Sequence, residues 1–265
     1  MDKKRIVIKV GTSTLTYENG KINLRRVDTL SKVLSDLRNF GHEVVLVSSG
    51  AIGVGVGKLG LPERPKSTME KQALAAIGQC ELMFMYDKFF SEYNNTVAQV
   101  LLTKYSVESD HQKENVINTF NTLLKMGIIP IVNENDTVAI DELEGNNFGD
   151  NDMLSAFVAS LVGADKLIIL TDIDGLYTDN PRTNPDAIHL DVVLEITDEI
   201  MHMASGSGSN RGTGGMTTKL SAAKFVTAYG TDCIVLNGEN PEILYDAIEG
   251  KPTGTLFKGK GEEKC

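Results

Sequence analysis

Short apolar runs rich in Val, Ile and Leu alternate along the chain with stretches whose apolar residues recur at helical spacing. Such runs predict strands that are buried on both faces, and the amphipathic stretches predict the helices that cover them. The expected strands are residues 5–10, 43–48, 96–102, 128–133, 166–171 and 232–236. The expected helices are residues 24–40, 67–90, 115–126, 150–162 and 217–229, with a last helix between Asn240 and Gly250. This alternation predicts an α/β fold, a three-layer α/β/α sandwich with a mainly parallel central sheet.

Capping residues mark several helix boundaries. Asn23 is expected to cap the first long helix, and Gly41 to end it. Ser67 and Glu70 have the spacing of a capping box, in which each side chain bonds the backbone of the other residue.

Two segments lack regular periodicity. Residues 138–149 are polar and predict a hairpin or flap, and the glycine-rich residues 204–215 predict a mobile segment. We identify no interdomain linker rich in Pro or Ser and no abrupt change of composition along the chain, so residues 1–265 are expected to form a single domain.

Composition narrows the class of protein. The net charge is −10, which argues against a broad basic face for nucleic acid but permits a local cationic site. No apolar run approaches the roughly 18 residues of a membrane span, so no contact with a membrane is expected. Three scattered cysteines, Cys80, Cys233 and Cys265, are too few for a disulfide framework. These features predict a cytoplasmic protein.

Small, hydroxyl and acidic residues follow four of the expected strands, at the edge where parallel α/β sheets bind ligands. The four segments are Lys9 to Ser13, Ser48 to Ala51, Glu134 to Thr137, and Thr171 to Gly175. The first two have the glycine and hydroxyl composition of a phosphate-binding turn, and Lys9 adds a cation beside the first. For Lys9 alone, a lysine that extends to solvent from a strand end is the more ordinary interpretation.

The segment Gly212 to Lys219 leads directly into a helix. Backbone N–H groups, the positive helix end and a first-turn lysine would converge on an anion there. By contrast, Gly55 to Gly60 matches the G-x-G-x-x-G spacing of dinucleotide sites, but it does not open a helix. We therefore expect a phosphate site at the former segment and none at the latter.

The acidic pair of Asp150 and Asp152 opens a predicted helix. Aspartate at this position is often only a cap, but a carboxylate between two lysines would hold both ammonium groups in place. The four histidines have no spacing that suggests a metal site or a catalytic triad, and no G-x-S-x-G nucleophile motif is present.

These motifs, in this order, resemble the amino acid kinase family, and within it the members that phosphorylate L-glutamate. The matching segments are residues 7–13, 47–52, 132–136, 149–152, 170–178 and 212–219, and the resemblance extends over about residues 5–258. It implies ATP and Mg²⁺ as cofactors, and transfer of a phosphoryl group to the side-chain carboxylate of L-glutamate as the first step of L-proline synthesis. Many family members carry a C-terminal PUA domain, for which we expect no room in this chain.

The resemblance also implies residue roles. Lys9 and Lys219 would hold the β- and γ-phosphates as catalytic residues, and Asp152 would orient both lysines. The implied glutamate-binding residues are Ser49, Asp136 and Asn151. The implied ATP-binding residues are Lys9, Gly11, Thr12, Ser13, Thr171, Asp172, Thr213, Gly214, Gly215, Met216, Thr217, Thr218 and Lys219. Glutamate would thus bind the N-terminal part and ATP about residues 160–258, while the metal ligands stay unassigned.

Other partners and alternatives follow from the same resemblance. It implies a homo-oligomer, with L-proline as a feedback inhibitor. A kinase of the same fold that acts on N-acetylglutamate, aspartate or a nucleoside monophosphate is one alternative. A nucleotide-sensing or anion-storage protein without turnover is another, although such a protein would not need Lys9, Asp152 and Lys219 together.

Overall fold

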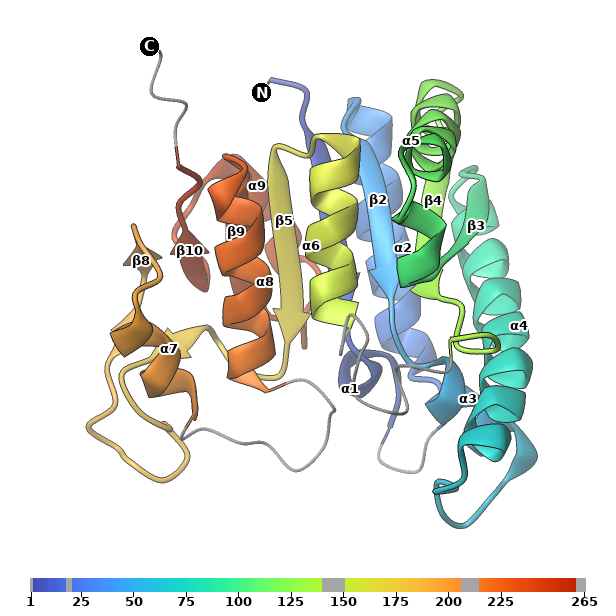
Figure 1. Ribbon diagram of the computed structural model, residues 1–265, viewed down its shortest axis with the longest axis horizontal. Coiled ribbons are helices and arrows are strands. Elements are labelled where there is room, and N and C mark those ends of the chain that lie inside the picture. Colours follow the sequence, from blue (N-terminus) through green and yellow to red (C-terminus); the bar gives the residue numbers. More distant parts are fainter. Residues whose placement is uncertain (1, 18–20, 140–150, 206–214, 261–265) are drawn as a thin grey trace.

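The computed structural model describes residues 2–17, 21–139, 151–205 and 215–260. Within these ranges the core is an eight-stranded sheet in the order β3-β4-β2-β1-β5-β9-β10-β8 (Figure 1). The strands are β1 (Arg5–Val10), β2 (Glu43–Ser48), β3 (Val97–Leu102), β4 (Ile129–Glu134), β5 (Lys166–Thr171), β8 (Val192–Val193), β9 (Asp232–Asn237) and β10 (Thr255–Phe257). Neighbouring strands are parallel except for β9 and β10. β6 (Leu176–Tyr177) and β7 (His189–Leu190) form a separate antiparallel pair.

Helices cover both faces of this sheet (Figure 1). On one face lie α5 (Asp110–Lys125), α6 (Asn151–Val162), α7 (Asp198–Ser205) and α8 (Met216–Ala228). On the other lie α1 (Thr12–Leu15), α2 (Leu24–Phe40), α3 (Ala51–Leu59), α4 (Thr68–Glu92) and α9 (Ile243–Glu249). A short 3₁₀ helix, η1 (Lys104–Val107), follows β3. The three-layer sandwich and the mainly parallel sheet predicted from the sequence are therefore confirmed.

The central strand β1 shows how the sheet directs side chains to its two faces. Ile6 and Ile8 pack with α2, α4 and α9, whereas Val7 packs with α6 and α8. Each of these side chains is fully buried, which stabilises the fold by about 1.5–3 kcal/mol per side chain. Because side chains alternate along a strand, Lys9 projects to the same face as Val7. The strand thereby places a lysine beneath the first turns of α6 and α8.

Most predicted boundaries agree with the structure within two residues. Asn23 caps α2 by accepting a hydrogen bond from the Arg26 N–H, and Gly41 ends that helix in the left-handed conformation at φ 111°. One expectation was wrong: within the described chain, the Ser67 side chain makes no capping hydrogen bond. There α4 begins instead with a backbone bond from the Lys71 N–H to the Ser67 carbonyl, at 3.0 Å.

The helix predicted over residues 115–126 begins five residues earlier, at Asp110. Its first turn is polar and carries no apolar periodicity, but Ser109 caps it by accepting a hydrogen bond from the Gln112 N–H. The last helix begins at Ile243, although the Asn240 side chain accepts a hydrogen bond from the Glu242 N–H at 3.1 Å. The earlier start of α5 concerns a polar first turn, where the hydrophobic pattern gives no signal.

Helix α3 was not predicted, because its sequence contains Gly53, Gly55 and Gly57, and each glycine lowers helix propensity. Tertiary packing outweighs that cost. A Cβ added to Gly55 would lie 2.2 Å from the Leu74 carbonyl oxygen, and one added to Gly78 would lie 1.7 Å from the Ala51 carbonyl oxygen. The glycines thus allow α3 and α4 to pack backbone to backbone. The expectation that Gly55 to Gly60 does not open a helix is correct, since these residues end α3.

The predicted flap falls largely in residues 140–150, and the predicted mobile segment largely in residues 206–214. Both of these ranges lie outside the described residues. In the part that is described, no helix combines the length and apolar character needed to cross a membrane.

Candidate active site

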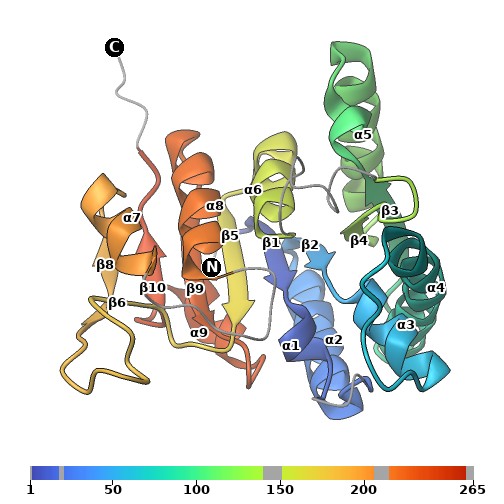
Figure 2. The same ribbon diagram turned by 60° about the horizontal axis from the view of Figure 1, so that its bottom comes forward.

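The carboxyl edge of the sheet gathers most of the polar residues singled out in the sequence. β1 ends beside α1, β2 ends beside α3, and the first turns of α6 and α8 lie at the same edge (Figure 2). Asp152 lies in the first turn of α6 and Lys219 in the first turn of α8. Helix packing thus brings residues far apart in the sequence to the end of the central strand.

Asp152 joins the two lysines. Its Oδ1 lies 2.6 Å from Lys9 Nζ, and its Oδ2 lies 3.2 Å from Lys219 Nζ. The Asp152 residue is 0% exposed, Lys9 is 4% exposed and Lys219 is 6% exposed. Two buried cations thus share one buried anion, which leaves a net positive charge of one among these three groups.

Electrostatics keep that carboxylate ionised. Burial alone raises the pKa of Asp152, but the charges of Lys9 and then Lys219 outweigh burial. Hydrogen bonds from Lys9 and Thr218 act in the same direction, so the pKa lies well below that of an ordinary aspartate. Asp152 is therefore a permanent anion at neutral pH and is unsuited to act as a general base.

A second polar group lies beside this one and joins β2, β4 and α6. Asn151 donates from Nδ2 to Ser49 Oγ at 2.8 Å and to Asn133 Oδ1 at 3.2 Å. Asn133 Oδ1 also accepts the backbone N–H of Glu134 at 2.9 Å, which identifies it as the oxygen of that amide. The Asn151 side chain must therefore present its NH₂ to Asn133. Its own Oδ1 is buried and has no hydrogen-bond partner among the described residues.

Sequence reasoning missed two members of this group. Asn133, which is 2% exposed, lies within a segment that was singled out, but only Asp136 was selected there. A buried amide at a strand end was the available signal. Gln79 on α4 accepts a hydrogen bond from Asn133 Nδ2 at 2.9 Å, and nothing in the helical pattern distinguishes it from its neighbours.

Asp136 lies two residues beyond β4, in a turn closed by a backbone bond from the Val138 N–H to the Asn135 carbonyl at 3.0 Å. This places it at the same edge of the sheet as Ser49, which follows β2. The three expected glutamate-binding residues therefore all lie at this edge, and Ser49 and Asn151 are in direct contact.

The expected nucleotide residues occupy two places. Gly11 precedes α1, which contains Thr12 and Ser13, and a Cβ added to Gly11 would lie 3.7 Å from Lys9 Nζ. Gly215 precedes α8, whose first turn contains Met216, Thr217, Thr218 and Lys219. Thr213 and Gly214 lie outside the described residues.

Thr171 ends β5, and Asp172 follows it. Burial raises the pKa of Asp172, but the hydrogen bond from Arg182, at 3.0 Å, lowers it below the ordinary value together with a backbone hydrogen bond, the charge of Arg182 and the Thr171 hydroxyl. Asp172 is thus paired with Arg182 rather than with the lysines around Asp152.

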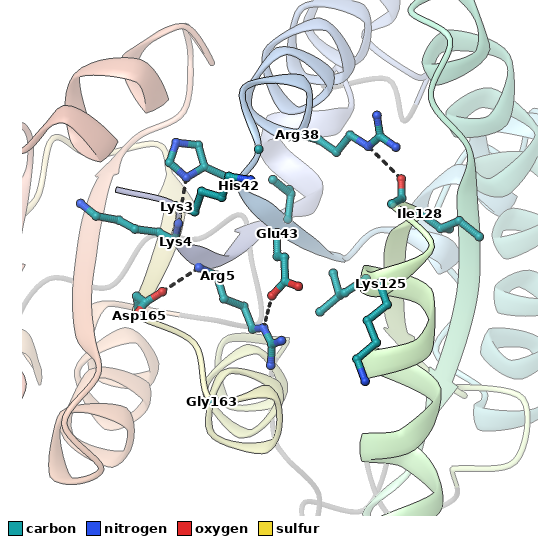
Figure 3. Close-up of a pocket in the computed structure, with 14 residues that line it drawn as sticks. Lys3, Lys4, Arg5, Arg38, His42, Glu43, Lys125, Ile128, Gly163 and Asp165 are labelled. Carbon is teal, nitrogen blue, oxygen red and sulfur yellow. Dashed lines mark hydrogen bonds and ion pairs between the residues drawn. The ribbon is translucent and has the colours of Figure 1, made fainter. Parts of the chain in front are cut away.

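A cavity of about 620 Å³ lies at the opposite, amino edge of the sheet (Figure 3). Its two arginines have structural partners. Arg38 donates from Nε to the Gly127 carbonyl beyond α5 at 2.9 Å, and Arg5 pairs with Glu43 at 2.6 Å. Arg5 also donates to the Val162 carbonyl at the end of α6. Cations at helix C-termini stabilise the exposed carbonyls there, so we assign these side chains to the fold.

In the described residues, no three His, Cys, Asp or Glu side chains come together in a way that could hold a metal ion. The fold and the site instead define an α/β protein with a buried cationic centre at the carboxyl edge of its sheet. Such a centre suits a phosphorylated ligand and its transfer chemistry.

The chain belongs to the amino acid kinase family, whose model matches residues 4–237. It is 63% identical over 263 residues to a protein from Clostridium perfringens named "Glutamate 5-kinase", covering 99% of this chain and 98% of that protein. Proteins with the same name from Listeria innocua and Enterococcus faecalis are 57% and 54% identical, with coverage of at least 95% on both sides.

Solved structures agree with the fold. A carbamate kinase from Giardia lamblia bound to AMP-PNP has a TM-score of 0.67 at 19% identity, covering 97% of this chain and 99% of that one. A UMP kinase from Bacillus anthracis has a TM-score of 0.65 at 17% identity, with 97% of each chain covered. At these identities the likeness concerns the fold alone.

Proposed function

We propose that this protein is a kinase that transfers the γ-phosphoryl group of ATP to the side-chain carboxylate of L-glutamate. The product is L-glutamyl 5-phosphate, the first intermediate in L-proline synthesis from glutamate. The assignment of glutamate as the substrate rests on the 63% identity to a protein named glutamate 5-kinase, over 99% of this chain and 98% of that protein. The buried Lys9–Asp152–Lys219 cluster supports the reaction type.

The chemistry needs no general base. A glutamate carboxylate has a pKa of about 4.3 and is already an anion at pH 7. One of its oxygens attacks the γ-phosphorus, and the bond from that phosphorus to the β–γ bridging oxygen breaks. ADP leaves with the electron pair, and no proton moves. The barrier arises from bringing two anions together and from charge on the transferred group, so positioning and positive charge are the main requirements.

The described side chains can meet these requirements. Lys9 and Lys219 would neutralise the phosphates from two directions, and Asp152 would hold their ammonium groups in place. Because one carboxylate leaves one positive charge uncompensated, the cluster would attract a phosphate oxygen instead of closing into a neutral pair. Mg²⁺ would accompany ATP, since phosphate oxygens are typical ligands of this ion and it would supply further positive charge there.

The neighbouring polar group fits the amino acid end of glutamate. The buried Asn151 Oδ1 could accept a hydrogen bond from the α-ammonium, and Asp136 would supply the opposite charge. N-acetylglutamate has a neutral α-nitrogen, so an aspartate at this place favours glutamate over that substrate.

Replacing Asp136 with alanine is expected to weaken glutamate binding by about 2–5 kcal/mol, because a desolvated ammonium would lose its counter-charge. ATP affinity should change by less than about threefold. Thr137→Ala, in the same exposed turn, is the matched control and should leave both affinities unchanged. Titration calorimetry with each ligand measures the difference. A variant that loses ATP affinity but keeps glutamate affinity contradicts this assignment.

Feedback inhibition by L-proline fits the same contacts. Proline keeps the α-carboxylate and the α-nitrogen of glutamate but has no side-chain carboxylate to attack ATP. Inhibition is therefore expected to be at least partly competitive with glutamate. Initial rates over a grid of both concentrations test this. Absence of inhibition at millimolar proline and subsaturating glutamate refutes it, and competition with ATP alone would place the proline site elsewhere.

The proposal also includes a homo-oligomeric state and a cytoplasmic location.

The substrate proposal is tested by measuring ADP release with glutamate, N-acetylglutamate, aspartate and UMP as separate acceptors. Sustained release with glutamate alone is the expected result. Release with another acceptor would instead favour a different kinase of this fold, and no release with any of them would favour a binding protein without turnover.

A further inference from the structure

The Thr218 hydroxyl lies between two acceptors in the first turn of α8. Its Oγ1 is 2.9 Å from Asp152 Oδ2 and 2.9 Å from the Gly215 carbonyl oxygen. A hydroxyl has a single proton to donate, so only one of these two acceptors receives it at any time. Which acceptor receives it decides whether Thr218 acts on the charged cluster or only on the helix.

The two distances are equal, but charge and burial favour Asp152. A hydrogen bond to an ionised carboxylate is roughly twice as strong as one to a neutral carbonyl. Asp152 is also 0% exposed, so its oxygens depend on donors from the protein. Thr227 in the same helix gives the contrast: among the described residues its hydroxyl acceptors are main-chain carbonyls, Ala223 at 2.8 Å and Lys224 at 3.4 Å. Thr227 thus represents the ordinary backbone bond of a helical threonine.

We propose that Thr218 is a positioning residue: its hydroxyl donates to Asp152 Oδ2 and fixes the carboxylate so that each oxygen holds one lysine. Oδ1 faces Lys9, whereas Oδ2 faces both Lys219 and Thr218. Without the hydroxyl, the carboxylate can rotate and both ammonium groups lose their fixed directions. Thr218 thereby acts through Asp152 on the two lysines, independently of any contact with the nucleotide. This inference rests on the proposed kinase function.

The test compares Thr218→Val, Thr218→Ser and the matched control Thr227→Val in steady-state assays with ATP and glutamate. Valine keeps the shape of threonine but removes the hydroxyl, whereas serine keeps the hydroxyl. For Thr218→Val we expect kcat to fall about 10- to 100-fold with both KM values within about threefold of the wild type. Thr218→Ser should keep kcat within about threefold, and Thr227→Val should not alter kcat.

A second arm asks whether Thr218 acts through Asp152. In an Asp152→Asn background, adding Thr218→Val should change kcat by less than about twofold, because the carboxylate it orients is already absent. Thermal melting of every variant separates a loss of folding from a loss of positioning.

Three results overturn the inference. The first is an unchanged kcat in Thr218→Val, and the second is a serine variant as slow as the valine variant. The third is a rise in the KM for ATP that accounts for the whole loss, which would make Thr218 a nucleotide ligand. If the wild-type enzyme itself produces no ADP with glutamate, the proposed function has failed, and that outcome is distinct from these three.

Discussion

Replacing Lys219 with alanine is expected to lower kcat at least ~100-fold while glutamate affinity stays nearly unchanged. The Lys219 side chain is only 8% exposed and its ammonium is held 3.2 Å from Asp152, so it acts in a desolvated environment where a fixed charge has a large effect. Because negative charge on the transferred group is largest in the transition state, the loss should appear mainly in kcat. Initial rates of ADP formation at saturating ATP and glutamate measure this kcat.

Lys224→Ala is the matched control for this prediction. Lys224 lies on the same helix, but its side chain is 54% exposed and pairs with Asp198 at 3.8 Å on the surface. Its removal should change kcat by less than about twofold. Equal activities of the two purified, folded alanine variants would remove Lys219 from the mechanism.

The second large effect is expected from Asp152→Asn, which keeps the shape of the side chain but removes its charge. We expect kcat to fall at least ~100-fold, because Lys9 and Lys219 lose the anion that fixes them. Leaving two buried ammonium groups without a counter-charge should also lower the free energy of unfolding by about 3–5 kcal/mol. ATP affinity should not decrease, since the same lysines become free to attract phosphate.

The stability effect has a defined dependence on pH. Because the pKa of Asp152 is lower in the folded than in the unfolded state, its carboxylate stabilises the fold above its ordinary, unfolded-state pKa. This contribution is lost as pH falls through the lowered, folded-state pKa. Urea unfolding at pH 7 and near pH 3 should therefore show a smaller gap between wild type and Asp152→Asn at the acidic pH. Asp198→Asn is the control, because Asp198 is the exposed ion-pair partner of Lys224. A gap that does not narrow contradicts the account of Asp152.

The sequence could predict the six longer strands of the sheet because most of them are buried on both faces, whereas the short strands β8 and β10 were not predicted. Residues 43–48 and 166–171 each contain four consecutive apolar residues, 44–47 and 167–170, and the predicted bounds agree with β2 and β5. Helix α3 could not be predicted in the same way. Gly55 of α3 is needed because the Leu74 carbonyl of α4 lies against it, and Gly78 of α4 likewise lies against the Ala51 carbonyl of α3. Such contacts between separate helices leave no local pattern in the sequence.

The site shows the same division. Lys9 ends a strand and Lys219 follows a glycine-rich segment, so each could be selected from its local context. Asp152 was also selected, and the structure shows how it reaches both lysines: α6 and α8 cover the same face of β1. Asn133 had only the weak signal of an amide at a strand end and Gln79 had none, since their hydrogen bonds depend on how α4, β4 and α6 pack together.

Trapping of the product with hydroxylamine tests the central claim most directly. The protein is incubated with ATP, Mg²⁺ and hydroxylamine, together with glutamate, N-acetylglutamate or aspartate in parallel reactions. An acyl phosphate reacts to give a coloured hydroxamate, whereas a phosphate ester does not. The account predicts hydroxamate with glutamate, in a yield equal to the ADP released, and little with the other two acids. ADP release with glutamate but without hydroxamate, or hydroxamate only with another acid, would contradict it.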